Sequence, residues 1–351
     1  MAREIGSEFE SMPYTARGTD VSSLFPGADV LYTFCGRGAL ETVLKNAGTR
    51  RKAALPSWCC DSMIEPFRKA GIGVCFYPVG YDDGLTVDYS GVPADCDILL
   101  SMRYFGFASP EPPEGLAGQL HKNGCLLIED CTHSLLSGEP CRPWNDCAIV
   151  SLRKWFPLVS GGMAVSRRGG FQTELAAPPE EYIRLRLGAM DDKRTYLETG
   201  KGDKQSFLTR YAEANERLRE GYPGLGIDSV SEKILAGTDT ETVRQRRIQN
   251  AHILYKGLKG CSAVRFLFPE EAIDCPLFVP VFLEKEKRDA LRQALIKEAV
   301  YCPVHWPRPQ SCESVLYERE LSLICDQRYT EEDMFRIVEI IIQAPGKGYE
   351  A

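Results

Sequence analysis

The sequence predicts an α/β protein with a large domain, whose mostly parallel sheet is sandwiched by helices, and a smaller C-terminal α+β domain. Between about residue 30 and residue 166, short apolar runs alternate with helix-like stretches. The apolar runs are nearly continuous in hydrophobicity, which is typical of parallel strands covered on both faces. The last hundred residues mix strand and helix patterns without this alternation.

The elements of the large domain follow one another in order. The strand candidates are residues 53–55, 74–79, 98–102, 125–129, 147–151 and 163–165. The helix candidates between them are residues 38–46, 61–70 and 113–123. Such alternation predicts an open, doubly wound sheet, in which ligands sit outside the carboxyl ends of the strands.

The chain changes character after Pro178-Pro179. Charged helical sequence runs to about residue 220, a turn-rich break covers 221–226, and a long helical pattern from 240 to 258 links the two domains. Further on, residues 277–283 and 300–303 indicate strands, and 285–299 and 331–343 indicate helices. We therefore predict a large domain over residues 1–240, with the first ~28 residues as an N-terminal arm, and a small α+β domain over 241–351.

Charge and hydropathy exclude several classes of partner. A net charge of −7 argues against nucleic-acid binding, because phosphate contacts need a basic face. No apolar run approaches the roughly 18 residues of a spanning helix, and the N-terminal residues contain no apolar signal core. We expect no membrane partner and a cytoplasmic location.

Cysteine and histidine spacing argues against a metal site. The fourteen cysteines contain no C-x-x-C pair, and the four histidines form no H-x-x-x-H. In a chain of this size the cysteines are interpreted as reduced, mostly buried small hydrophobic residues. We expect no metal.

Two strand ends carry the chemistry. One apolar run ends at Asp130, and the next leads through Ser151 to Lys154, seven residues before Gly161-Gly162. This is the layout that pyridoxal 5'-phosphate (PLP) needs: the aspartate keeps the pyridine nitrogen protonated, and the lysine holds the aldehyde as a Schiff base. Adjacent Arg153 and a buried setting would favour the neutral amine of Lys154. The alternative is a surface lysine that begins a loop.

Other residues in this order complete a cofactor site. A turn before a helix is formed by Gly36, Arg37 and Gly38, and backbone N–H groups at such a position bind phosphate well. A tight turn that binds no ligand would explain the same three residues. Trp58 follows a strand and offers a ring for stacking, or it belongs to the core. His133 lies three residues after Asp130 and could donate to the phenolic oxygen of the cofactor, and the Ser151 hydroxyl could bind the phosphate.

This order resembles the fold-type I PLP enzymes, specifically the DegT/DnrJ/EryC1/StrS aminotransferase family. The resemblance covers most of the chain. It is carried by residues 6–9, 35–40, 55–60, 104–107, 128–134, 151–155 with 161–162, 303–307 and 325–330. The aspartate–histidine and lysine–glycine-glycine motifs are the specific ones.

The resemblance implies a PLP-dependent aminotransferase in which Asp130, His133 and Lys154 are catalytic. It assigns Gly36, Arg37, Gly38, Trp58 and Ser151 to the cofactor, together with the three catalytic residues. It implies an amino-acid donor, a small keto acceptor that is sugar-derived in the best-known members, and a homodimer with its active site near the subunit interface. The candidate substrate contacts are Tyr104, His305, Trp306 and Arg328, since an arginine suits a donor carboxylate.

Three departures from the family pattern bear on these roles. The usual Ser-x-x-x-x-Lys is shortened to Ser-x-x-Lys at Ser151 and Lys154, and the phosphate turn has Arg37-Gly38 where Thr-Ser is common. The segment Gly-Tyr-Asn-Tyr-Arg, through which many members reach the neighbouring cofactor, is not found. Two alternative functions stay open: other PLP chemistry, such as a lyase, dehydratase or racemase, and a non-catalytic PLP-fold binding protein.

Overall fold

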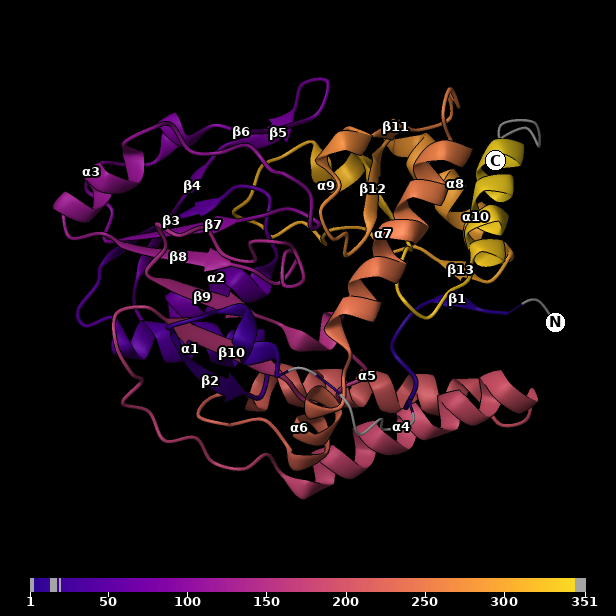
Figure 1. The fold of residues 1–351 in the computed structure, drawn as a ribbon, viewed down its shortest axis with the longest axis horizontal. Coiled ribbons are helices and arrows are strands. Elements are labelled where there is room, and N and C mark those ends of the chain that lie inside the picture. Colours follow the sequence, from indigo (N-terminus) through magenta and orange to yellow (C-terminus); the bar gives the residue numbers. More distant parts are fainter. Residues whose placement is uncertain (1–2, 13–17, 19, 345–351) are drawn as a thin grey trace.

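The computed structural model describes residues 3–12, 18 and 20–344. The chain forms a large α/β unit that carries a pair of long helices and a smaller unit built from the C-terminal third (Figure 1).

A seven-stranded sheet forms the centre of the large unit. Its order is β2-β10-β9-β8-β7-β3-β4, with β2 Asp29–Thr33, β10 Gly162–Ser166, β9 Cys147–Val150, β8 Leu126–Asp130, β7 Ile98–Met102, β3 Lys52–Pro56 and β4 Gly73–Tyr77. Strand β10 is antiparallel to both neighbours, and the remaining pairs are parallel. Every residue of β7, β8, β9 and β10 is buried, so both faces of the sheet are covered.

Helices and one hairpin surround this sheet. Helix α1 (Gly36–Asn46) packs on β10 and β9, α2 (Asp61–Lys69) on β4, and α3 (Leu116–Lys122) on β8. The hairpin of β5 (Val79–Tyr81) and β6 (Leu85–Val87) follows β4. The 3-10 turns are η1 (Val21–Leu24), η2 (Tyr89–Gly91), η3 (Leu152–Lys154) and η4 (Glu270–Ala272).

Helices α4 (Glu180–Thr199) and α5 (Lys204–Gly221) lie side by side and extend beneath both units (Figure 1). Helix α6 (Ser229–Ala236) follows, and α7 (Thr240–Gly257) leads into the smaller unit. The Asp228 and Asp239 side chains accept from backbone N–H groups at the starts of α6 and α7, which explains where these helices begin.

The smaller unit holds a three-stranded antiparallel sheet and further helices. The sheet order is β11-β12-β14, with β11 Arg265–Phe266, β12 Val279–Phe282 and β14 Glu320–Leu323. The helices are α8 (Lys285–Lys297), α9 (Leu316–Arg319) and α10 (Glu331–Gln343), and a capping box of Thr330 and Asp333 starts α10. Strand β1 (Ile5–Gly6) of the arm pairs in parallel with β13 (Val300–Tyr301), beside this unit (Figure 1).

The fold class expected from the sequence is confirmed, and most elements lie where their patterns indicated. The sequence patterns did not predict β1, β2, the β5–β6 hairpin, α6, β11, α9 or β14. A domain boundary near residue 240 stays a proposal. It is supported by the start of α7 at Thr240.

Candidate active site

Lys154 ends η3, the turn that leaves the carboxyl end of β9. The indole Nε1 of the next residue, Trp155, donates to the carbonyl oxygen of Thr132 at 2.6 Å, which ties this turn to the loop after β8. Gln327 donates to the Trp155 carbonyl oxygen at 2.7 Å and accepts from the Nε of Arg247 at 2.8 Å. The lysine turn is therefore fixed by both the large and the smaller unit.

His133 faces Lys154. The Nε2 atom of His133 lies 3.3 Å from the Nζ atom of Lys154, while its Nδ1 atom accepts the backbone N–H of Phe105 at 3.2 Å. Burial, reinforced by the charge of Lys154 and by His305, lowers the pKa of His133 well below its ordinary value, so the ring is neutral at pH 7. Because Nδ1 is an acceptor, the single ring proton belongs on Nε2 and points at the lysine amine.

Asp130 ends β8 and is buried beneath the same loop. Its Oδ1 atom accepts the backbone N–H of Thr132 at 2.9 Å, and no salt bridge among the described residues reaches this carboxylate. Burial raises the pKa of Asp130, although bonds from Thr132 and the charge of Lys154 oppose the shift. A buried carboxylate with so little compensation favours a cationic N–H beside it, and a pyridinium nitrogen has that chemistry.

The N-terminus of α1 is a candidate anion cradle next to Ser151. Helix α1 begins at Gly36 after Cys35, which makes no side-chain cap hydrogen bond, and the first-turn N–H groups of a helix favour an anion. A Cβ atom on Gly36 would lie 3.0 Å from the Cβ of Ser151, which shows how closely the cradle and the lysine loop approach. A Cβ on Gly162 would meet the Cys35 carbonyl at 2.2 Å. The glycine of the Gly-Gly motif therefore allows β10 to pack against the start of α1.

Arg37 lies in this cradle, but its side chain turns toward α2. Its Nε atom lies 3.2 Å from Glu65, which also pairs with Lys69. The backbone of Arg37 faces the cradle, whereas its charge already has a carboxylate partner.

The aromatic residues form a stack behind the lysine. Trp58 is fully buried, its ring lies 4.9 Å from that of Tyr104 at 14°, and its Nε1 donates to the carbonyl oxygen of His305. The Tyr104 hydroxyl donates to the Trp58 carbonyl oxygen at 2.7 Å, so Tyr104 has no free donor. Trp306 lies 5.7 Å from His133 at 27° and 5.4 Å from Trp58. Trp306 thus bridges the histidine to the Trp58–Tyr104 stack.

A pocket of about 440 Å³ opens beside the lysine. Its lining includes Glu8 and Phe9 of the arm, Arg153, Lys154, His305 and Arg328. Neither Tyr104 nor Trp306 lines it. His305 Nδ1 lies 2.8 Å from the Ser322 hydroxyl, and burial lowers the pKa of His305 despite the nearby Glu320.

Arg328 belongs to this lining with every donor already used. Its Nε and Nη2 atoms bind the two carboxylate oxygens of Asp326 at 3.0 and 2.8 Å. The Nη1 atom donates to Glu10 and to the carbonyl oxygen of Glu8, and Nη2 also donates to that of Ser7. This arginine holds the arm against the smaller unit.

Sequence reasoning predicted an N-terminal arm but missed its place at this pocket and its partners. Glu8 binds Arg186 at 2.8 Å and Asn215 at 3.0 Å. Burial alone would raise its pKa, but the charges of Arg186 and Arg153, with the hydrogen bonds from Arg186 and Asn215, together lower the pKa of Glu8 to about 2. Arg247, also in the lining, lies over the Trp155 ring at 4.5 Å. No local pattern distinguishes these residues, because they come together only through tertiary packing.

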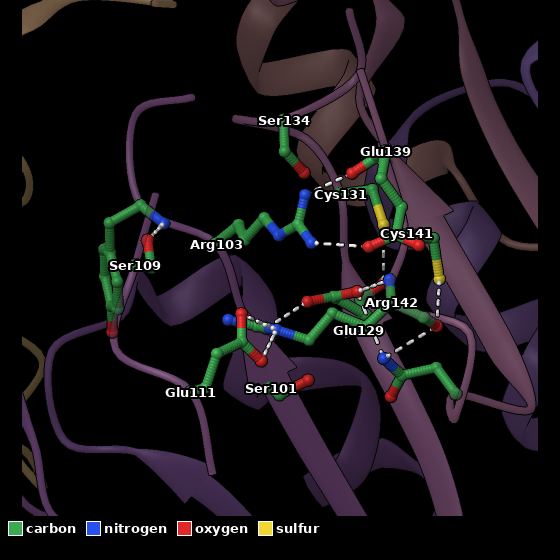
Figure 2. Close-up of polar contacts among 12 residues, drawn as sticks. Ser101, Arg103, Ser109, Glu111, Glu129, Cys131, Ser134, Glu139, Cys141 and Arg142 are labelled. Atoms are coloured by element: carbon green, nitrogen blue, oxygen red, sulfur yellow. Dashed lines mark hydrogen bonds and ion pairs between the residues drawn. The ribbon is translucent and has the colours of Figure 1, made fainter. Parts of the chain in front are cut away.

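A buried polar network surrounds Glu129, the residue that precedes Asp130 in β8 (Figure 2). Glu129 pairs with the Arg142 side chain and accepts the Arg142 backbone N–H at 2.6 Å and the Asn145 amide at 3.1 Å. Cys131 and Cys141 lie beside Glu129, and the three side chains are close enough together to hold a metal ion. The Glu129 carboxylate is already committed to Arg142, so we interpret the cluster as the support of the loop after β8.

The similarity of this chain to known proteins lies in its fold. No helix in the described part of the chain is long and apolar enough to cross a membrane. No family model matches the chain, and no curated protein matches its sequence. Solved structures do match.

A DegT DnrJ EryC1 StrS aminotransferase from Brucella abortus has a TM-score of 0.62 and 17% identity, covering 93% of this chain and 90% of its own. DesI, solved in the presence of its TDP-sugar product, has a TM-score of 0.62 and 18% identity, covering 94% and 86%. Spr1654 from Streptococcus pneumoniae, in its PLP form, has a TM-score of 0.66 and 14% identity, covering 98% and 99%. The chain therefore has the fold that these proteins share, the fold-type I arrangement.

Proposed function

We propose that this protein is a PLP-dependent aminotransferase, which moves an amino group from an amino-acid donor to a small keto acceptor. One observation carries the proposal: the Lys154 amine lies 3.3 Å from a neutral His133, next to Asp130, a buried carboxylate without an ion-pair partner among the described residues. This is the donor set that PLP requires of its protein.

Each residue has a distinct task. When bound, PLP supplies an electron sink for a carbanion at the substrate carbon. Lys154 would hold the cofactor aldehyde and then carry a proton between carbon atoms as a general acid–base. Asp130 would keep the ring nitrogen protonated, and His133 would donate its Nε2 proton to the phenolic oxygen. The backbone of α1 at Gly36 would hold the phosphate, together with Arg37, Gly38 and Ser151.

The remaining expected contacts are part of the same proposal. Trp58 would stack on the cofactor, and His305 would line the substrate side. Trp306 and Tyr104 would support these residues from behind, since neither lines the pocket. Because DesI was solved in the presence of a TDP-sugar product, a sugar-derived keto acceptor is the first class to test.

A homodimer with its active site near the subunit interface also belongs to the proposal, as does a reducing, cytoplasmic setting. The pocket beside Lys154 is lined in part by the N-terminal arm, a segment that crosses from one unit to another. All fourteen cysteines are free thiols, which suits a reducing compartment.

The test follows the cofactor spectroscopically. Wild-type protein mixed with PLP should gain a visible absorbance band, and borohydride should fix the cofactor to the peptide that contains Lys154. Lys154→Ala should lose the band, the covalent label and turnover while its circular dichroism stays unchanged. Lys69→Ala is the matched control, since Lys69 is exposed and pairs with Glu65 on α2.

The same samples separate the alternatives. Amino-donor addition should bleach the band and release a keto acid, and a keto acceptor should restore the band. A keto acid formed continuously without any acceptor would indicate elimination instead. Wild-type protein that binds PLP but reacts with no donor would favour a non-catalytic binding protein, and full turnover by Lys154→Ala would refute the role of this lysine.

A further inference from the structure

Arg153 is a partly buried cation that forms no salt bridge among the described residues. It precedes Lys154 in η3, and its Nε and Nη1 atoms are shielded from solvent yet make no hydrogen bond to the described residues. A guanidinium N–H that is buried without an acceptor costs free energy, so such an atom normally has a partner.

Comparison with similar arginines sharpens this point. Four arginines in the described part of the chain keep a buried nitrogen without a hydrogen bond: Arg37, Arg153, Arg186 and Arg210. Three of them have a carboxylate within salt-bridge distance, namely Glu65, Glu8 and Asp192. Arg153 has no such carboxylate among the described residues, although its charge helps to lower the pKa of Glu8 against the effect of burial.

The pocket that contains Arg153 leaves room for an anion. Arg153 and Lys154 are neighbours in its lining, and the pocket volume of about 440 Å³ lies in the range of small-molecule sites. The other charged groups of the lining have partners. Arg328 spends its donors on the arm and on Asp326, and the Glu8 carboxylate is bound by Arg186.

We propose that Arg153 binds an oxyanion of the ligands that Lys154 acts on, and that it rather than Arg328 is the anion receptor of this pocket. The inference rests on the proposed function and deepens it. Two sources offer this chemistry: the carboxylate of the amino donor, which would enter the pocket, and the phosphate of the cofactor at the α1 cradle. Ser151 lies two residues before Arg153 and lines that cradle. Arg153 is therefore close along the chain to the cradle as well as being part of the pocket lining.

Anion binding to the full chain, freed of bound small molecules, tests this without any turnover. The probes are inorganic phosphate and glutarate, which has no amino group and cannot react. Titration calorimetry is run on wild type, Arg153→Gln and Arg153→Lys. Arg217→Gln is the matched control, because Arg217 is half-exposed on α5 and pairs with Glu213 there.

Arg153→Gln should weaken binding of one probe about tenfold or more, the loss expected for a hydrogen bond between charged groups. Arg153→Lys should recover part of that affinity, because lysine keeps the positive charge but lacks the planar, two-pronged geometry of the guanidinium group. A loss confined to glutarate assigns Arg153 to the donor carboxylate, and a loss confined to phosphate assigns it to the cofactor. Loss of both probes assigns a shared anion site.

Unchanged affinity of Arg153→Gln and Arg153→Lys for both probes overturns the proposal, as does wild-type protein that binds neither probe. The absorbance band that forms with PLP tests the proposed function separately. If that band never forms while an anion still binds through Arg153, the aminotransferase assignment fails and the anion receptor stands.

Discussion

Arg142→Met should destabilise the protein by roughly 3–5 kcal/mol, the usual cost of removing one partner from a buried ion pair. Glu129 is fully buried, and the Arg142 side chain is 2% exposed. Figure 2 shows the two side chains paired. The substitution leaves the Glu129 carboxylate with two neutral donors, the Arg142 backbone N–H and the Asn145 amide. The second partner of Arg142, Glu111, is 60% exposed and adds at most about 1 kcal/mol.

Urea unfolding followed by circular dichroism measures the free energy of unfolding. The double variant Arg142→Met/Glu129→Gln should recover at least about 1 kcal/mol of the loss, because the stranded charge is removed with its partner. Arg168→Met is the control. Its carboxylate partner is Asp146, but Arg168 is half-exposed, so the loss should stay below about 1 kcal/mol. An Arg142→Met variant as stable as the control, or a double variant that merely adds both losses, would refute this account of the network.

Three further outcomes are expected. Burial lowers the pKa of Lys193 to about 8. Between pH 8 and 10.5 the unfolded chain therefore holds a proton that the folded chain has released. The free energy of unfolding should rise with pH across that window by up to about 3 kcal/mol. Thermal melts of Lys193→Met should lack this rise, and an unchanged pH profile in the variant would contradict it. Gly162→Ala should lower the melting temperature because its Cβ would collide with the Cys35 carbonyl, whereas Gly118→Ala, with open space around it in α3, should raise the melting temperature slightly. Asp130→Asn should weaken PLP binding about tenfold or more in an absorbance titration. The cofactor-free variant should be as stable as the wild type or more stable, because burial raises the pKa of the Asp130 carboxyl. Tight PLP binding by the variant would count against a pairing of Asp130 with the ring nitrogen.

Much of the fold could be predicted from local patterns. Strand β7 and helix α10 begin and end at the residues that the sequence indicated. These elements carry their own signals: a continuous apolar run for a strand buried on both faces, and a capping box with apolar periodicity for the helix. The short elements β11 and α9 were not predicted, because two to four residues are too few to show a period.

The direction of β10 depends on its neighbours. A buried apolar run looks the same in either direction, and only pairing with β2 and β9 makes this strand antiparallel. The β1–β13 pair likewise joins residues about 295 positions apart along the chain, a contact that no local window contains.

The sequence alone determined the order of the site: a carboxylate at one strand end, a lysine after the next, and a glycine-flanked helix start, because parallel strands bring their carboxyl ends to one edge. Only the tertiary structure decided which charges are free. Arg37 and Arg328 are suitable anion ligands by residue type, yet Glu65 and Asp326 already neutralise them, while Arg153 keeps buried donors without a partner. The physical reason is that the availability of a charge depends on its nearest counter-charge, and in this protein those counter-charges come from helices and an arm distant in sequence.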